Sequence, residues 1–181
     1  MLILGGRSEG RLTEQHDVFF GIGKTLSNLI PQMKAFWPGC KGLHIDSWRE
    51  VTEVNGYSIS VIERSKQKTK SNEKLFFINL GGYKENDMEE YHYKLLTVSN
   101  SKTEALKSAK QTAFFKHTGI KAPGGNSHID DKFGVDVDDA YEIDEVLENS
   151  LKAKYSVIIK KEDSISPDQL NIGYLTFSKI K

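Results

Sequence analysis

The sequence predicts an α+β fold made of two tandem strand-strand-helix-strand-strand units with mostly antiparallel sheets and a C-terminal strand pair. Apolar residues alternate with polar ones in the expected strands and follow helical spacing in the expected helices. Short motifs also recur in one order, which indicates an internal duplication. Leu4-Gly5-Gly6 returns as Leu80-Gly81-Gly82, Glu14-Gln15-His16 as Glu90-Tyr91-His92, His44-Ile45-Asp46 as His128-Ile129-Asp130, and Gly56-Tyr57-Ser58-Ile59 as Ala140-Tyr141-Glu142-Ile143.

The first unit spans residues 1–62. Residues 1–4 form a short apolar strand that we expect to close in a turn at Gly5-Gly6. Residues 14–22 alternate as a strand, and residues 25–37 follow the spacing of an amphipathic helix, in which Pro31 must cause a kink or begin the regular part. Residues 43–54 and 57–62 are strands joined by the hairpin turn Asn55-Gly56.

The second unit spans residues 75–147, after a polar, basic linker at 63–74. Residues 75–80 and 90–98 read as strands, and a helix follows over 101–117, where Ser101 and Glu104 have capping-box spacing. Residues 128–137 and those from 141 onward complete the strand set. The tail comprises residues 148–181, and a short helix is expected over 145–152. The tail strands at 155–159 and 172–180 are expected to pack on open sheet edges of the repeats.

Composition excludes several classes of function. The 181 residues carry 25 Lys+Arg and 25 Asp+Glu, and this zero net charge argues against binding to nucleic acid by bulk electrostatics. The single cysteine, Cys40, excludes an internal disulfide and a cysteine-built zinc site. The sequence shows neither a signal peptide nor an apolar run long enough for a membrane span, so we expect a soluble cytoplasmic protein.

Several motifs resemble a known family. Leu4-Gly5-Gly6-Arg7, Glu14 to Val18, Lys34 to Trp37, His44 to Trp48 and Gly56-Tyr57 are similar to the bacterial DUF1543 family of domains of unknown function, whose members carry one or two copies. The tail motifs Leu151 to Tyr155 and Ile172 to Leu175 resemble the end of its longer members. The second unit departs from the pattern, with Tyr83 for Arg7, Tyr93 for Asp17 and Lys132 for Trp48. The resemblance implies no activity, cofactor or catalytic residue.

The histidines are the strongest candidates for chemistry. Glu14 and His16 share one strand face, as do His44 and Asp46, so neighbouring strands would gather all four side chains. Two imidazoles and a carboxylate suit zinc, iron or manganese, which makes His16, His44 and Asp46 candidate metal ligands. The repeated pattern adds further binding candidates in the second unit, namely His92, His128 and Asp130. Two readings remain open beside a metal site: a structural hydrogen-bond network and a histidine general base oriented by Asp.

Other motifs give weaker evidence for a binding or catalytic site. Arg7 and Arg11 flank a glycine-rich loop that could bind an anion, although the second unit loses this character. The sequence around Gly23-Lys24-Thr25 fails the phosphate-loop pattern because Val18 stands at the required glycine. Lysines crowd the linker and carboxylates crowd the second unit, which leaves self-association open.

No complete catalytic motif is present, so the sequence favours a non-catalytic binding or interaction module for an unknown small ligand or protein partner. The alternative is a small metal-dependent enzyme that uses the His/His/Asp cluster. No cofactor can be named from the sequence.

Overall fold

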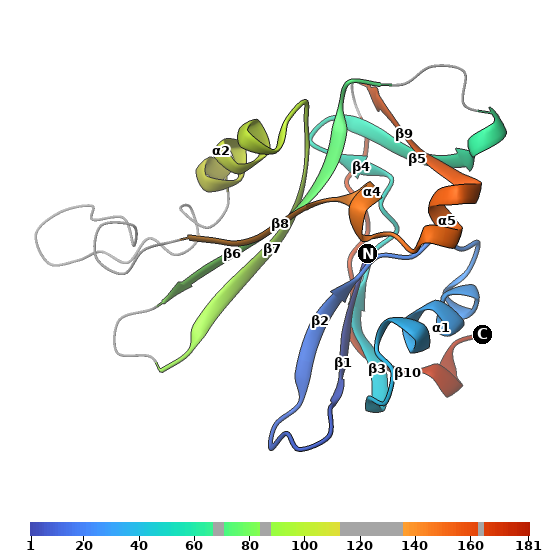
Figure 1. Cartoon of the computed structure of the whole chain (residues 1–181), viewed down its shortest axis with the longest axis vertical. Coiled ribbons are helices and arrows are strands. Elements are labelled where there is room, and N and C mark those ends of the chain that lie inside the picture. Colours follow the sequence, from blue (N-terminus) through green and yellow to red (C-terminus); the bar gives the residue numbers. More distant parts are fainter. Residues whose placement is uncertain (67–70, 84–87, 113–135, 163–164) are drawn as a thin grey trace, which may run out of the picture. The chain divides into compact units, whose positions relative to one another are not determined.

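The computed structural model describes residues 1–66, 71–83, 88–112, 136–162 and 165–181. It confirms the α+β class, with antiparallel sheets and C-terminal strands (Figure 1). The chain forms two compact units: unit 1 comprises Met1–Gln67 and Leu147–Lys181, and unit 2 comprises Lys68–Val146. Within the described residues, no helix is long and apolar enough to cross a membrane.

Unit 1 contains two antiparallel sheets. The larger sheet has the order β10-β3-β1-β2 and the smaller has the order β4-β5-β9. The first part of the chain supplies β1 (Leu2–Arg7), β2 (Gln15–Phe19), α1 (Leu26–Phe36), β3 (Lys41–Trp48), β4 (Glu53–Val54) and β5 (Tyr57–Glu63), followed by a 3₁₀ turn (Arg64–Lys66). The tail supplies α5 (Asn149–Lys154), β9 (Tyr155–Lys161), β10 (Asn171–Thr176) and a second 3₁₀ turn (Phe177–Lys179).

The core of unit 1 lies between α1 and one face of the larger sheet. Leu29 and Met33 of α1 pack with buried strand residues, which include Leu2, Leu4 and Ile45. The helix begins where the Thr25 side chain accepts a hydrogen bond from the backbone N–H of Asn28, at 3.4 Å. It starts before Pro31 and continues through it, so Pro31 does not begin the regular part.

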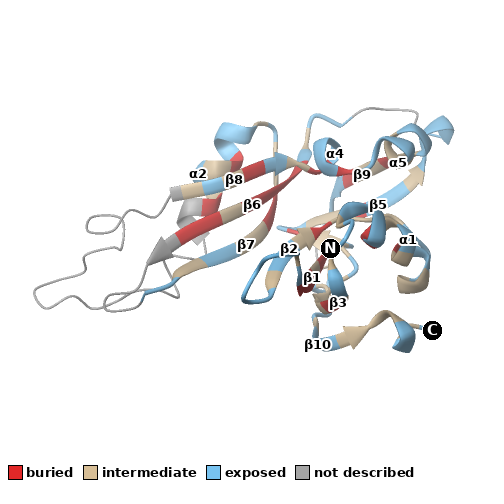
Figure 2. Ribbon diagram, turned by 60° about the horizontal axis from the view of Figure 1, so that its bottom comes forward, coloured by how far each residue is buried: buried red, intermediate tan, exposed pale blue. Residues whose placement is uncertain are grey.

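Unit 2 is a three-stranded sheet with one helix packed against it. Its elements are β6 (Lys74–Tyr83), β7 (Glu90–Ser99), α2 (Lys102–Thr112), β8 (Asp136–Glu142) and α4 (Ile143–Val146), with the strand order β7-β6-β8. The core contains Phe76, Ile78 and Leu80 of β6 together with Ala105 and Ala109 of α2. Figure 2 shows how the buried residues of this unit follow β6. The small alanines let α2 lie close to the sheet, as their spacing predicts.

The structure corrects the expected turn at Gly5-Gly6. Strand β1 continues through both glycines to Arg7, and β6 likewise continues through Gly81-Gly82 to Tyr83. A glycine inside a strand marks a place where another group approaches the backbone closely. At Gly5 those groups are side chains of β3, because an added Cβ would lie 2.5 Å from His44 Nε2.

Part of the predicted repeat alignment is wrong. Gly56–Ile59 was aligned with Ala140–Ile143, but β5 pairs with β4 and β9, whereas β8 pairs with β6. These segments therefore occupy different places in their units. The segment His128-Ile129-Asp130 and the end of the expected helix at His117 lie outside the described residues.

The Asn55-Gly56 turn is confirmed, because Asn55 (φ 54°) and Gly56 (φ 78°) both have positive φ angles, as a type I′ hairpin requires. The expected strand at 43–54 divides into β3 and β4, and the expected strand at 172–180 ends at Thr176. In the tail, β10 pairs with β3 and β9 pairs with β5. The two strands with which the tail pairs, β3 and β5, both belong to unit 1.

Candidate metal centre

Three strands place the candidate residues in one row of the larger sheet of unit 1. Gly5 in β1 lies directly opposite His16 in β2 and opposite His44 in β3. Leu4 and Ile45, the neighbours of Gly5 and His44, point into the core with α1. Because side chains alternate along a strand, His16 and His44 point to the other face of the sheet.

Asp46 joins the row through a β-bulge. In the pairing of β1 with β3, Ile3 lies opposite Ser47 and Leu4 opposite Ile45, so Asp46 is the extra residue of β3. A bulge redirects a side chain locally. Here the carboxylate lies over Gly5, where an added Cβ would be 2.5 Å from its Oδ2 atom.

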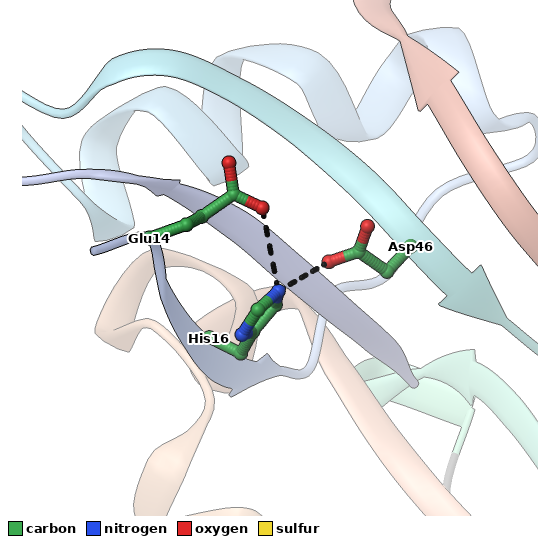
Figure 3. Close-up of side chains that lie close together, drawn as sticks. All are labelled: Glu14, His16 and Asp46. Atoms are coloured by element: carbon green, nitrogen blue, oxygen red, sulfur yellow. Dashed lines mark ion pairs between the residues drawn. The ribbon is translucent and has the colours of Figure 1, made fainter.

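The four side chains of this cluster converge, and we call Glu14, His16, His44 and Asp46 the unit 1 cluster. Nε2 of His16 lies 3.4 Å from Oε1 of Glu14 and 3.3 Å from Oδ2 of Asp46, as Figure 3 shows. Nε2 of His44 lies 3.3 Å from the same Glu14 oxygen and 3.2 Å from Oδ1 of Asp46. Each imidazole thus faces both carboxylates.

His44 is the buried member, with only 2% of its side chain exposed. Its Nδ1 lies 2.7 Å from the carbonyl oxygen of Gly42, so Nδ1 carries the hydrogen and donates it to that oxygen. The ring also contacts Tyr174 of β10, with ring centroids 4.3 Å apart. These contacts fix the ring and direct Nε2 at the cluster.

Neither Nε2 of His44 nor Oδ2 of Asp46 forms a hydrogen bond within the described residues, although both atoms are buried. A nitrogen lone pair repels carboxylate oxygens at these distances unless a positive charge lies between them. Buried polar atoms without a partner cost about 1–3 kcal/mol each. A cation at this place would remove both penalties.

The donor set fits a transition-metal ion. In a tetrahedral zinc site with bonds of about 2.0–2.1 Å, two ligand atoms are about 3.3–3.4 Å apart. The four nitrogen–oxygen distances of the unit 1 cluster are 3.2–3.4 Å. Imidazole nitrogen and carboxylate oxygen are common zinc ligands, and a hydrogen bond from the other ring nitrogen to a backbone carbonyl is the usual support of a ligating histidine.

Cys40 lies near this site but has the wrong protonation state for a thiolate ligand. Burial, and then the negative charge of Glu14, raise the pKa of the Cys40 thiol above its usual value. The thiol therefore stays neutral at pH 7.

Unit 2 contains a smaller cluster in the same register. Gly81 lies opposite His92, and Asp138 is the extra residue of a bulge, because Asn79 pairs with Asp139 and Leu80 with Val137. Nε2 of His92 is 3.2 Å from Oδ2 of Asp138 and 3.9 Å from Oε2 of Glu90. We call Glu90, His92 and Asp138 the unit 2 cluster.

The structure brings some of the candidate residues together. Ligand atoms of Glu14, His16 and Asp46 lie within 4.8 Å of one another, and His44 lies beside both carboxylates, although the expected neighbouring strands are separated by β1. Arg7 and Arg11 are exposed and are not members of the cluster. His92 lies in the unit 2 cluster, but the predicted partners His128 and Asp130 lie outside the described residues. The sequence did not predict Asp138, because the repeat alignment matched Asp46 with Asp130 instead.

The comparisons with known proteins were made for the whole chain. Residues 11–61 match the family model Domain of Unknown Function (DUF1543). That stretch contains all four residues of the unit 1 cluster. The match supports the family resemblance for this part of unit 1, but it does not extend to unit 2.

The fold has a counterpart among solved structures. The crystal structure of a protein Il1583 from Idiomarina loihiensis is similar to the chain, with a TM-score of 0.64 and 20% sequence identity. The match covers 97% of this chain and 94% of that one. At this identity the likeness concerns the fold alone. The search of curated proteins found no match.

Proposed function

We propose that unit 1 is a metal-binding module that holds one divalent transition-metal ion, with zinc as the best fit. The observation that carries the proposal is the set of four nitrogen–oxygen distances of 3.2–3.4 Å around a buried histidine nitrogen that makes no hydrogen bond. The ligands would be Glu14, His16, His44 and Asp46. Glu14, His16 and Asp46 offer ligand atoms within 4.8 Å of one another, and His44 adds a second imidazole beside both carboxylates, which are ligand types that zinc accepts.

The same geometry weakens the structural alternative. A histidine retained for a structural network satisfies its buried nitrogens with hydrogen bonds. His44 does so at Nδ1 through Gly42, but Nε2, which faces two carboxylates, has no such partner. This combination is typical of a metal ligand with an ordered second partner.

Four protein ligands complete a tetrahedron and leave no position for a substrate, which favours binding over catalysis. The alternative, a metal-dependent enzyme, has one observation in its favour. The Glu14 side chain is 43% exposed and precedes β2, so water could displace it and leave a His₂Asp set with an open position.

We also propose that unit 2 is a second, diverged copy of the module. Support comes from the pairing of Gly5 with His16 and of Gly81 with His92. It also comes from a bulge that lies just before the leucine of each central strand, between Ile3 and Leu4 and between Asn79 and Leu80. In this alignment Asp138, rather than Asp130, corresponds to Asp46. That the protein is bacterial and cytoplasmic, and that it does not bind nucleic acid, stays a prediction from the sequence.

A zinc titration of the full chain tests the proposal. The protein is stripped with a chelator and titrated in competition with a chromophoric zinc indicator. We expect one tightly bound zinc ion per chain, with a dissociation constant below about 1 μM. His44→Ala should weaken this binding at least about 100-fold, because it removes the buried ligand.

The controls separate a lost ligand from a lost fold. His16 is half-exposed, so His16→Ala should leave the circular dichroism spectrum unchanged and still weaken zinc binding. His92→Ala, which removes a histidine from unit 2, should leave the tight zinc ion in place. If the wild-type chain binds no zinc more tightly than about 100 μM, the proposal is wrong.

A further inference from the structure

The unit 2 cluster is built by the same backbone devices as the unit 1 cluster. A glycine without a side chain, Gly81, leaves room for the Asp138 carboxylate, which an added Cβ would meet. His92 faces this position from the neighbouring strand, and Glu90 lies two residues before it on the same face of β7. The ligand atoms of the three side chains all lie within 4.8 Å of one another.

The unit 2 cluster differs from the unit 1 cluster in number of imidazoles and in exposure. At the register position of His44, opposite the glycine, unit 2 has Asp136. Every side chain of the cluster is about one-third exposed (His92 37%, Glu90 36%, Asp138 30%), whereas His44 is buried. The described part of the cluster thus offers one imidazole and two carboxylates in contact with water.

These differences change the ion that would bind. Carboxylates and water are the ligands preferred by hard cations of octahedral geometry, such as Mn²⁺, while a second imidazole shifts preference toward zinc. In an octahedral site with bonds of about 2.1 Å, adjacent ligand atoms are about 3.0 Å apart and opposite ones about 4.2 Å apart. The distance of 3.2 Å from His92 to Asp138 is near the spacing of adjacent ligands, and the distance of 3.9 Å from His92 to Glu90 is nearer to that of opposite ones.

We infer that unit 2 holds a second divalent cation of the Mn²⁺ type, through Glu90, His92 and Asp138, with water in the remaining positions. The site is weaker than that of unit 1 because it has fewer protein ligands and more exposure. Its water-filled positions make it the place where an outside ligand could reach a metal ion in this protein. The inference does not depend on zinc binding, since no ligand belongs to unit 1.

A manganese titration tests the inference. The chain is first loaded with one equivalent of zinc, and Mn²⁺ is then added while the electron paramagnetic resonance signal of free Mn²⁺ is recorded. We expect one Mn²⁺ per chain with a dissociation constant of about 10–500 μM. His92→Ala and Asp138→Asn should each weaken this binding at least about tenfold.

A matched control identifies binding to scattered surface carboxylates. Asp144 is an exposed acid on α4 outside the cluster, so Asp144→Asn should leave Mn²⁺ binding unchanged. The inference is overturned if no Mn²⁺ binds below about 1 mM, or if Asp138→Asn and Asp144→Asn have equal effects. Because zinc is measured separately with the His44→Ala variant, either site can fail without the other.

Discussion

Unit 1 and unit 2 use one arrangement of backbone to present two different sets of ligands. In each, a glycine in the central strand faces a histidine, and a bulged aspartate on the other neighbouring strand lies over that glycine. The difference lies at one register position, which is His44 in unit 1 and Asp136 in unit 2. The backbone therefore sets where the ligands meet, and among the described residues this register position sets whether a second imidazole is present.

The units also differ in what surrounds the sheet. Unit 1 has a tail that pairs with two of its strands and an Asn55-Gly56 hairpin, while the described part of unit 2 relies on α2 and α4 alone. Within the tail, Asp168 accepts hydrogen bonds from Thr52 and Glu53. Its Oδ1 accepts hydrogen bonds from the backbone N–H of Thr52 and Glu53, at 3.0 and 3.1 Å, and from the Thr52 hydroxyl at 2.6 Å.

The largest expected effect comes from Asp168→Ala. The carboxylate is only 1% exposed and Arg49 lies 3.7 Å away, so its removal leaves a cation and three donors without their acceptor. We expect unit 1 to lose about 3–5 kcal/mol of unfolding free energy. Hydrogen exchange should show faster opening of β3, β4 and β10 but not of β6 and β7. Asp168→Asn, which keeps an acceptor oxygen, should cost less. Equally faster exchange in both units would show that Asp168 does not stabilise unit 1 selectively.

The second prediction concerns pH. Burial, helped by Arg49, lowers the pKa of the free amino terminus at Met1 from 8.0 to about 5. Between these values the unfolded chain binds more protons than the folded one, so stability rises from pH 5 to pH 8. The fall in this pKa from 8.0 to about 5 corresponds to at most about 4 kcal/mol, and the amides of unit 1 should show this gain.

An acetylated amino terminus provides the control for this pH dependence. It cannot be protonated, so the gain between pH 5 and pH 8 should disappear from unit 1. Persistence of the full gain after acetylation would show that another group causes it.

The third prediction replaces each of the two strand glycines, Gly5 and Gly81, with alanine. Gly5→Ala places a Cβ against His44 and Asp46 and should weaken zinc binding about 30- to 100-fold, or about 2–3 kcal/mol. Gly81→Ala does the same to Asp138 and should affect Mn²⁺ alone. Indicator and paramagnetic titrations of both variants measure the two effects. If Gly81→Ala also abolished zinc binding, the assignment of zinc to unit 1 would be wrong.

The smallest effect is expected at the hairpin of unit 1. Asn55 has a φ of 54°, a conformation that alanine adopts at a cost of about 1 kcal/mol. Asn55→Ala should therefore lower the urea midpoint slightly, whereas Asn55→Gly should leave it nearly unchanged. A larger loss in the glycine variant would mean that the Asn55 side chain, not the turn conformation, matters.

Sequence patterns predicted much of the fold and most of the unit 1 cluster. Alternation placed Glu14 with His16 and His44 with Asp46, but their strands are not neighbours. Strands β2 and β3 lie on either side of β1, and the side chains meet over Gly5. The glycines were misread, because a turn and a close approach both require glycine and only the partner strand distinguishes them. Asp138 was missed because the repeat alignment placed Asp130 at the position of Asp46, whereas the strand register places Asp138 there.

Anomalous diffraction from crystals of the full chain grown with zinc tests the central claim most directly. The account predicts a strong zinc peak in unit 1, bonded at about 2.0–2.1 Å to Nε2 of both His16 and His44 and to the carboxylates of Glu14 and Asp46. A well-ordered unit 1 without a peak at this place, and with His44 Nε2 hydrogen-bonded to a carboxylate instead, would contradict it.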